Sequence, residues 1–216
     1  MSRRTGAGLS RERVLQAGLE LVDREGVGAL TMRRLGKELG VEAMSLYGYV
    51  VNKQDLLDGV LDCVYDEMPR SIALDGPWQE RLRVTARKFR EVLLRHPNTV
   101  SLVAARPVMS EGSLGLVESA LAELRSLGVD IARANQVLTV IVAFTVGHVA
   151  SQVGDSDRPP ATEVQAFHHA LDRSRFPNVA DRAALGSVDR EAEFALGLDF
   201  IVDGVERLVC SQVAAR

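Results

Sequence analysis

Residues 31–50, TMRRLGKELGVEAMSLYGYV, limit the possible folds more than any other segment of the chain. Thr31 is a good N-cap for a short helix, and Gly40 is a good residue to end it. Val41 would then fill a tight turn before a second short helix. This layout is typical of a helix-turn-helix, in which the second helix enters the major groove of DNA. A helical hairpin of any bundle has the same spacing, so the spacing alone leaves both interpretations open.

A helical wheel divides the second of these helices into an inward and an outward face. Leu46 and Val50 point in the same direction and are expected to face a small core. Met44 and Gly48 lie on the opposite side, and Ser45 is exposed beside them. The outward face is therefore expected to be smooth and to carry no charge.

Two tyrosines, Tyr47 and Tyr49, flank this outward face on opposite sides. A helix in the major groove has a phosphate strand on either side, so flanking hydroxyl groups can donate hydrogen bonds to phosphates. Such contacts position the helix without reading the base sequence. The alternative for each tyrosine is that its ring packs on the core and its hydroxyl group lies in water.

Helical periodicity continues through the rest of the chain. A first helix is expected from Ser10, its N-cap, to Glu25, and Asn52 is expected to cap a longer helix that Pro69 closes. The later helices are expected at about 78–95, 99–105, 113–127, 131–152, 162–173 and 189–212. No strand-like alternation or internal repeat stands out. The predicted fold class is all-α, with a flexible arm at 1–9, a small helical domain at 10–69 and a larger helical body at 74–216.

The charge is divided unevenly between these regions. Residues 1–53 carry a net charge of +3, and the remainder carries −6. A basic front on an acidic body suggests that only the front meets a polyanion. Cys63 and Cys210 are too few and too far apart for a disulfide framework, and residues 1–9 lack the apolar core of a signal peptide. A cytoplasmic location is expected.

The most membrane-like segment is 134–154, which contains no charged residue. Its dense apolar part, 137–150, has 14 residues, whereas about 20 are needed to cross a bilayer. We therefore expect a helix that is buried on most faces in a helical core, and no association with a membrane.

Residues 30–57, LTMRRLGKELGVEAMSLYGYVVNKQDLL, resemble the DNA-binding segment of the tetracycline-repressor (TetR) family of bacterial transcription regulators. The shared pattern is a threonine, a Gly-Val turn, Leu-Tyr followed by an aromatic residue or histidine, and Asn-Lys. Residues 78–97, 105–107 and 193–209 are more loosely similar to the tetracycline-repressor-like C-terminal subclass. The resemblance covers most of the chain.

The resemblance implies a set of DNA contacts. Phosphates would be contacted by Tyr47, Tyr49 and Lys53, the bases would be faced by Ala43, Met44 and Ser45, and Thr31 and Arg33 would approach from the preceding helix. Lys53 stands at the start of a helix, where its charge opposes the helix dipole, so a purely structural role is disfavoured. Gly48 departs from the family, which usually has a larger side chain at this position. We therefore expect weak sequence specificity at the centre of each half-site.

A broad apolar stripe runs along the last predicted helix, made of Phe194, Leu198, Ile201, Val205 and Leu208. The resemblance implies that this helix and the one at 131–152 form a four-helix interface in a two-fold homodimer. The core of a bundle explains the stripe equally well.

The resemblance also implies a pocket for a small-molecule effector in the body. It would be lined by Phe89, Leu102, Arg106, Met109, Phe144 and His148. Arg106 and His148 are the candidate polar anchors, although a capped helix end and a satisfied core histidine explain them as well. Leu102 stands where tetracycline-binding members have a histidine that holds a magnesium chelate, so no metal and no cofactor are expected. His168 and His169 with Asp172 are a weaker metal candidate, because adjacent histidines on a helix point in different directions.

The function expected is that of a ligand-responsive repressor, which a small molecule releases from a palindromic operator of double-stranded DNA. An activator with the same architecture is one alternative. A helical small-molecule-binding protein or an enzyme is another, but the sequence has no phosphate-binding glycine loop, HExxH helix or nucleophile elbow. We therefore predict that the chain is not an enzyme.

Overall fold

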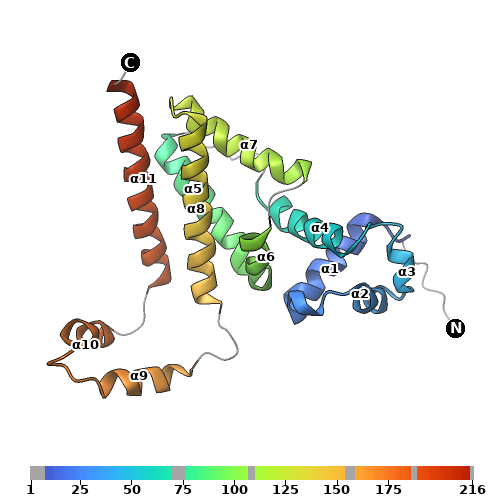
Figure 1. The fold of residues 1–216 in the computed structure, drawn as a ribbon, viewed down its shortest axis with the longest axis horizontal. Coiled ribbons are helices and arrows are strands. Elements are labelled where there is room, and N and C mark those ends of the chain that lie inside the picture. The colour runs from blue at the N-terminus through green and yellow to red at the C-terminus, as the bar shows by residue number, and fades with distance from the viewer. Residues whose placement is uncertain (1–7, 70–75, 107–109, 154–158, 186–188, 215–216) are drawn as a thin grey trace.

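The computed structural model describes residues 8–69, 76–106, 110–153, 159–185 and 189–214, and every regular element in these ranges is a helix, as predicted (Figure 1). The N-terminal helices are α1 (Arg11–Glu25), η1 (Val27–Ala29), α2 (Met32–Leu39), α3 (Ala43–Leu46) and α4 (Lys53–Asp66). The others are α5 (Trp78–Arg95), η2 (Pro97–Thr99), α6 (Val100–Ala105), α7 (Glu111–Ser126), α8 (Ile131–Gln152), α9 (Ala161–His169), α10 (Pro177–Ala184) and α11 (Arg190–Ala214).

Side-chain caps begin the N-terminal helices at the predicted residues. Ser10 accepts a hydrogen bond from the Arg13 amide at the start of α1 (3.2 Å), and Thr31 accepts one from the Arg34 amide at the start of α2 (3.1 Å). Asn52 caps α4 through the amides of Gln54 (2.8 Å) and Asp55 (3.0 Å). These caps fix where each helix of the helix-turn-helix region starts.

The apolar core does not stop at the end of the helix-turn-helix region. One cluster of buried side chains extends from α1, α2 and α4 into α5, α6 and α8, where it includes Leu93, Val103 and Val149. The α5, α8 and α11 helices lie side by side in the body, and α7 runs from α8 to α4 (Figure 1). The two regions are therefore joined by continuous packing as well as by the chain.

Polar side chains reinforce this junction at the end of α5. Both ring nitrogens of His96 lie 2.8 Å from carboxylate oxygens, Nδ1 from Asp23 on α1 and Nε2 from Glu67 after α4. Asn98 donates to the carbonyl oxygens of Val22 and Asp23 at the end of α1, at 3.1 and 3.0 Å. The end of α1 is therefore held by the segment that joins α5 to α6.

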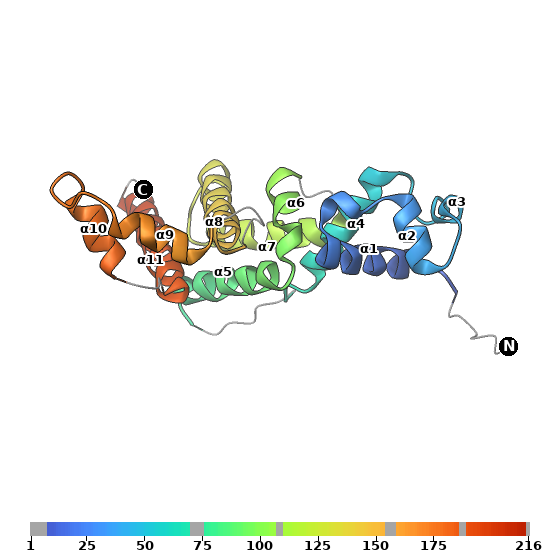
Figure 2. The ribbon, with the colours of Figure 1, turned by 90° about the horizontal axis from the view of Figure 1, so that it is seen from below.

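One prediction about the helices is wrong, and one helix was not predicted. Only a third of the most apolar part of α8 is buried in the single chain, although α8 is long and apolar enough to be a membrane-span candidate by composition. Its exposed face carries Val140, Ala143 and Gly147. The sequence also gave no indication of α10, which forms with α9 an arm at the opposite end of the molecule from the helix-turn-helix (Figure 2).

Candidate DNA interface and effector site

A close backbone approach at Gly36 sets the geometry of the helix-turn-helix. Gly36 is buried on α2, and a Cβ atom there would lie 2.9 Å from the Val41 carbonyl oxygen and 3.2 Å from the Ala43 amide nitrogen. Gly40 ends α2 in the left-handed conformation, with a φ of 69°. Gly36 therefore lets the turn fold back against α2, and Gly40 permits the left-handed conformation that ends α2.

The predicted inward and outward faces of the second helix are confirmed. Leu46 and Val50 are buried, whereas Met44 is 76% exposed and Tyr47 is 47% exposed. Ser45 and Gly48 are exposed as well. The α3 helix is shorter than the wheel assumed, because it ends at Leu46 and continues as turns in which the Tyr49 and Val50 amides donate to the Leu46 carbonyl (2.9 and 3.0 Å).

The structure treats the two flanking tyrosines differently. Tyr47 is exposed, whereas Tyr49 is only partly exposed and packs against the apolar cluster, as the alternative interpretation allowed. The Tyr49 carbonyl oxygen accepts a hydrogen bond of 2.7 Å from Arg11, the first residue of α1. Sequence reasoning missed Arg11, because nothing local in the sequence connects it to a residue 38 positions away.

The other predicted DNA-binding residues lie at or near the first residues of α2, α3 and α4. Lys53 is the exposed first residue of α4, and Thr31 and Arg33 are exposed at the start of α2. Ala43, the first residue of α3, is half-buried. By contrast, Arg34 forms ion pairs with Glu25 and Glu38, so its positive charge is balanced by carboxylates of the same chain.

Arg106, a predicted polar anchor of the effector pocket, points elsewhere. Its guanidinium donates to the Asp58 carboxylate at 2.9 and 2.5 Å and to the Gln54 side-chain oxygen at 2.6 Å, both on α4. The end of α6 is thereby tied to the helix that begins with Lys53. These bonds occupy the Arg106 side chain within the protomer, so its predicted contact with an effector stays a prediction.

The remaining predicted pocket residues fall into two groups. Leu102 and Phe89 belong to the apolar cluster shared with the helix-turn-helix region. Phe144 and His148, from α8, contact Phe194 of α11, with ring centroids 5.1 and 4.9 Å from that of Phe194. Met109 lies outside the described residues.

Arg90 completes the second group and was not predicted. Its guanidinium lies 5.0 Å from the Phe194 ring centroid, and its Nη1 donates to Glu191 at 2.6 Å. The Arg90 Nε and the His148 Nε2 are both buried without a hydrogen-bond partner among the described residues. No sequence signal singles out Arg90, because charged residues surround it on α5: Lys88 stands two positions before it and Glu91 directly after it.

His148 makes the stability of the fold depend on pH. Burial lowers the pKa of His148 below its ordinary value of 6.5, and the nearby positive charge of Arg90 acts in the same direction. The unfolded chain therefore binds more protons at this residue, so stability is lost as the pH falls through 6.5. We expect the denaturation midpoint to fall less between neutral and mildly acidic pH in His148→Gln than in the wild type. An equal fall in both proteins would contradict this assignment.

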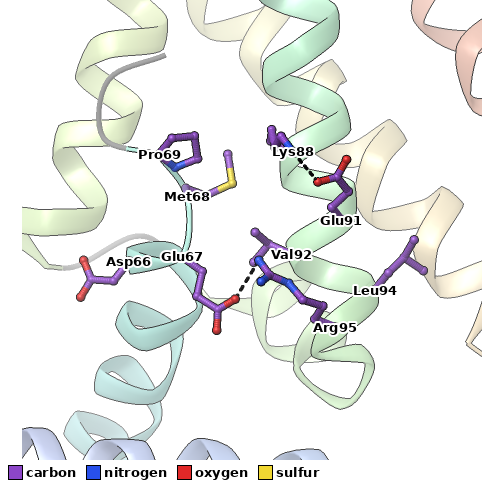
Figure 3. Close-up of a pocket in the computed structure, with 9 residues that line it drawn as sticks. All are labelled: Asp66, Glu67, Met68, Pro69, Lys88, Glu91, Val92, Leu94 and Arg95. Atoms are coloured by element: carbon purple, nitrogen blue, oxygen red, sulfur yellow. Dashed lines mark hydrogen bonds and ion pairs between the residues drawn. The ribbon is translucent and has the colours of Figure 1, made fainter. Parts of the chain in front are cut away.

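A cavity of about 740 Å³ opens between the end of α4 and α5 (Figure 3). It is lined by Asp66, Glu67, Met68, Pro69, Lys88, Glu91, Val92, Leu94 and Arg95. Arg95 forms an ion pair with Glu67 (2.8 Å), and Lys88 forms one with Glu91 (2.7 Å). None of the predicted effector-pocket residues lines this cavity.

The apolar stripe of α11 faces its own protomer, which corrects the predicted dimer interface. Phe194 and Leu198 are fully buried, Val205 is buried, and Ile201 and Leu208 pack against the cluster between α7, α8 and α11. A second apolar face of α11 is exposed instead, with Leu196 at 55% and Phe200 at 68%.

A helix-turn-helix with an exposed uncharged recognition surface, attached to a helical body, defines a DNA-binding transcription regulator. The family model "Bacterial regulatory proteins, tetR family" matches residues 14–60, and "Tetracyclin repressor-like, C-terminal domain" matches residues 73–209. The chain therefore belongs to the TetR family of transcriptional regulators, as its sequence predicted, and this is not a family of enzymes.

Individual relatives agree along nearly the whole chain. It is 34% identical to the class A tetracycline repressor protein of transposon 1721 from Escherichia coli, with 93% of each chain covered. It is 30% identical to the HTH-type transcriptional repressor DrrR1 of Streptomyces coeruleorubidus, over 94% of this chain and 80% of the relative. The structure of Streptomyces coelicolor ActR in complex with actinorhodin matches with a TM-score of 0.81 and 29% identity, over 93% of this chain and 96% of ActR.

Proposed function

We propose that this TetR-family regulator is a cytoplasmic repressor that binds a palindromic operator as a homodimer and leaves it when a small molecule binds. Residues 10–69 would bind DNA, and residues 74–216 would bind the effector and a second copy. The observation that carries the proposal is the exposed surface at α3 and its C-cap, where Met44, Ser45 and Tyr47 are all open to solvent.

In this proposal the DNA contacts divide into two kinds. Tyr47 and Lys53 bind phosphates on either side of the groove, with Thr31 and Arg33 approaching from α2. Ala43, Met44 and Ser45 face the bases, and Gly48 lets the backbone lie close to them. Apolar Met44 would contact thymine methyl groups and sense groove shape more than hydrogen-bonding patterns. We therefore expect weak discrimination between bases at the centre of each half-site.

The dimer would form through the exposed apolar faces of α8 and α11. On α8 these residues are Val140, Ala143 and Gly147, and on α11 they are Leu196 and Phe200. Large apolar side chains that are this exposed on neighbouring helices are typical of a contact with another protein. A two-fold dimer presents two α3 helices to two half-sites, which raises the affinity for a palindrome.

The effector would bind in the body near Phe144 and His148, with Phe89 and Leu102 contributing apolar surface. Two buried nitrogens, the Arg90 Nε and the His148 Nε2, support this position, because they make no hydrogen bond within the described part of the chain and buried polar atoms normally make one. The carboxylate nearest to the His148 Nε2 is that of Glu193, 3.7 Å away. The relative ActR has been seen in complex with actinorhodin. If the effector displaced α6, the Arg106–Asp58 pair would transmit the movement to α4, whose first residue is Lys53.

The DNA-binding proposal predicts different outcomes for two substitutions. Tyr47→Phe removes a phosphate donor, so it should weaken binding about fivefold on every sequence tested. Met44→Ala should change the ranking among operators that differ at the centre of a half-site. The measurement is fluorescence anisotropy with a panel of duplexes derived from the promoter next to the protein's own coding sequence.

Three results would contradict the proposal. Wild-type protein that fails to bind any of these duplexes at low salt would remove the DNA-binding function. A change of operator preference in Tyr47→Phe would show that Tyr47 reads bases, and an unchanged ranking in Met44→Ala would show that Met44 does not.

A further inference from the structure

Arg11 lies at the point where three parts of the helix-turn-helix region meet. Its Nη1 donates to the Tyr49 carbonyl oxygen (2.7 Å) and to Oδ2 of Asp55 (3.1 Å), and its Nη2 donates to Oδ1 of Asp55 (2.7 Å). Asp55 Oδ2 also accepts a hydrogen bond from the Val51 amide at 2.7 Å. One side-chain pair thus connects α1, the turn after α3 and the first turn of α4.

Within the pair, the positive charge of Arg11 is balanced by the Asp55 carboxylate. Contact through both terminal nitrogens and both carboxylate oxygens is the bidentate geometry that arginine and carboxylate favour. The Arg11 hydrogen bond holds the pKa of Asp55 below its ordinary value, so this carboxylate remains charged at neutral pH. Arg11 is about half-exposed, but its charge is already matched by Asp55.

The segment that this pair holds is short and lies mostly outside regular helix, although Val50 anchors it in the core. The α3 helix has four residues, and residues 47–52 form a turn and a bend before α4 begins. The Tyr49 carbonyl and the Val51 amide, which lie on either side of Val50, are both bonded to the Arg11–Asp55 pair. Tyr47 is two residues before the first of these groups, and Lys53 is two residues after the second.

We propose that Arg11 is a positioning residue for DNA recognition, which fixes the end of α3 against the start of α4 without touching a phosphate. With the pair intact, Tyr47 and Lys53 would be held at a fixed separation, which suits phosphates on either side of one groove. Without it, the turn samples other conformations, and binding must first order it. The inference rests on the DNA contacts proposed above.

The decisive test is the double variant Arg11→Met/Asp55→Asn, which removes the pair and leaves the local net charge unchanged. Operator affinity is measured by anisotropy at several salt concentrations, well below the unfolding temperature. We expect about tenfold weaker binding at every salt concentration, with the salt slope of the wild type. Arg11→Lys, which keeps the charge but not both contacts, should fall between the two. Lys53→Met is the comparison, because loss of a phosphate contact should lower the slope by about 0.9.

Two results would overturn the positioning role of Arg11. A slope that falls in the double variant as it does in Lys53→Met would overturn the proposal, because Arg11 would then be a phosphate contact. Unchanged affinity in the folded double variant, with only a lower unfolding temperature, would also overturn it, because the pair would serve stability alone. If the double variant does not fold, the operator affinity and the salt slope of Arg11→Lys are compared with those of the wild type in the same way. An unchanged slope in Lys53→Met would instead refute the proposed phosphate contact of Lys53.

Discussion

Replacing Phe200 with glutamate should leave the protomer folded, convert the dimer to a monomer and weaken operator binding by about 100-fold. Phe200 is 68% exposed in the single chain, so its loss removes little packing within the protomer. In the proposed dimer its ring lies in an apolar contact between two copies of α8 and α11, where an unpaired charge is strongly unfavourable. Sedimentation measures the mass, and anisotropy on the palindrome measures the affinity.

Two further variants test whether the effect depends on where the glutamate is placed. Leu114→Glu places the same charge at an apolar side chain of α7 that is 50% exposed, and it should change neither mass nor affinity. Leu198→Glu places it on the face of α11 that is buried in the protomer, so it should prevent folding. A Phe200→Glu protein that remains dimeric would show that this face is not the interface.

Replacing Gly36 with alanine should lower the free energy of unfolding by about 1–3 kcal/mol and weaken operator binding at least about tenfold. The added Cβ would lie 2.9 Å from the Val41 carbonyl oxygen and 3.3 Å from the Ala43 Cα, so it meets backbone atoms that cannot rotate away. The only relief is a shift of α3 relative to α2. Such a shift displaces Met44 and Tyr47 together and so affects both base and phosphate contacts.

Gly28→Ala is the matched control for this substitution. A Cβ at Gly28 would meet no atom within 4 Å, and Gly28 is not among the glycines with positive φ. We therefore expect wild-type affinity and stability from Gly28→Ala, measured by anisotropy and urea denaturation. A Gly36→Ala protein with wild-type values in both measurements would show that the turn tolerates a side chain and that the close approach is not needed.

The small domain could be predicted well because its signals are local. The caps Ser10, Thr31 and Asn52 act on amides two or three residues away, and Leu46 and Val50 are separated by about one helical turn. Both kinds of signal depend only on helix geometry. For Tyr49 the sequence left two positions open, and the structure shows the partly buried one, in which the residue packs against the apolar cluster.

The amino-acid sequence was sufficient for the all-α class, the helix-turn-helix, the family and most helix positions. Only the tertiary structure decided that Phe194 lies inside its own protomer and Phe200 outside it, since large apolar side chains occur on both sides of α11. It alone also paired Arg11 with Asp55 and Arg106 with Asp58, across 44 and 48 residues. The physical reason is that caps and helical faces follow from neighbours within about one turn, whereas contacts between helices depend on where the rest of the chain packs.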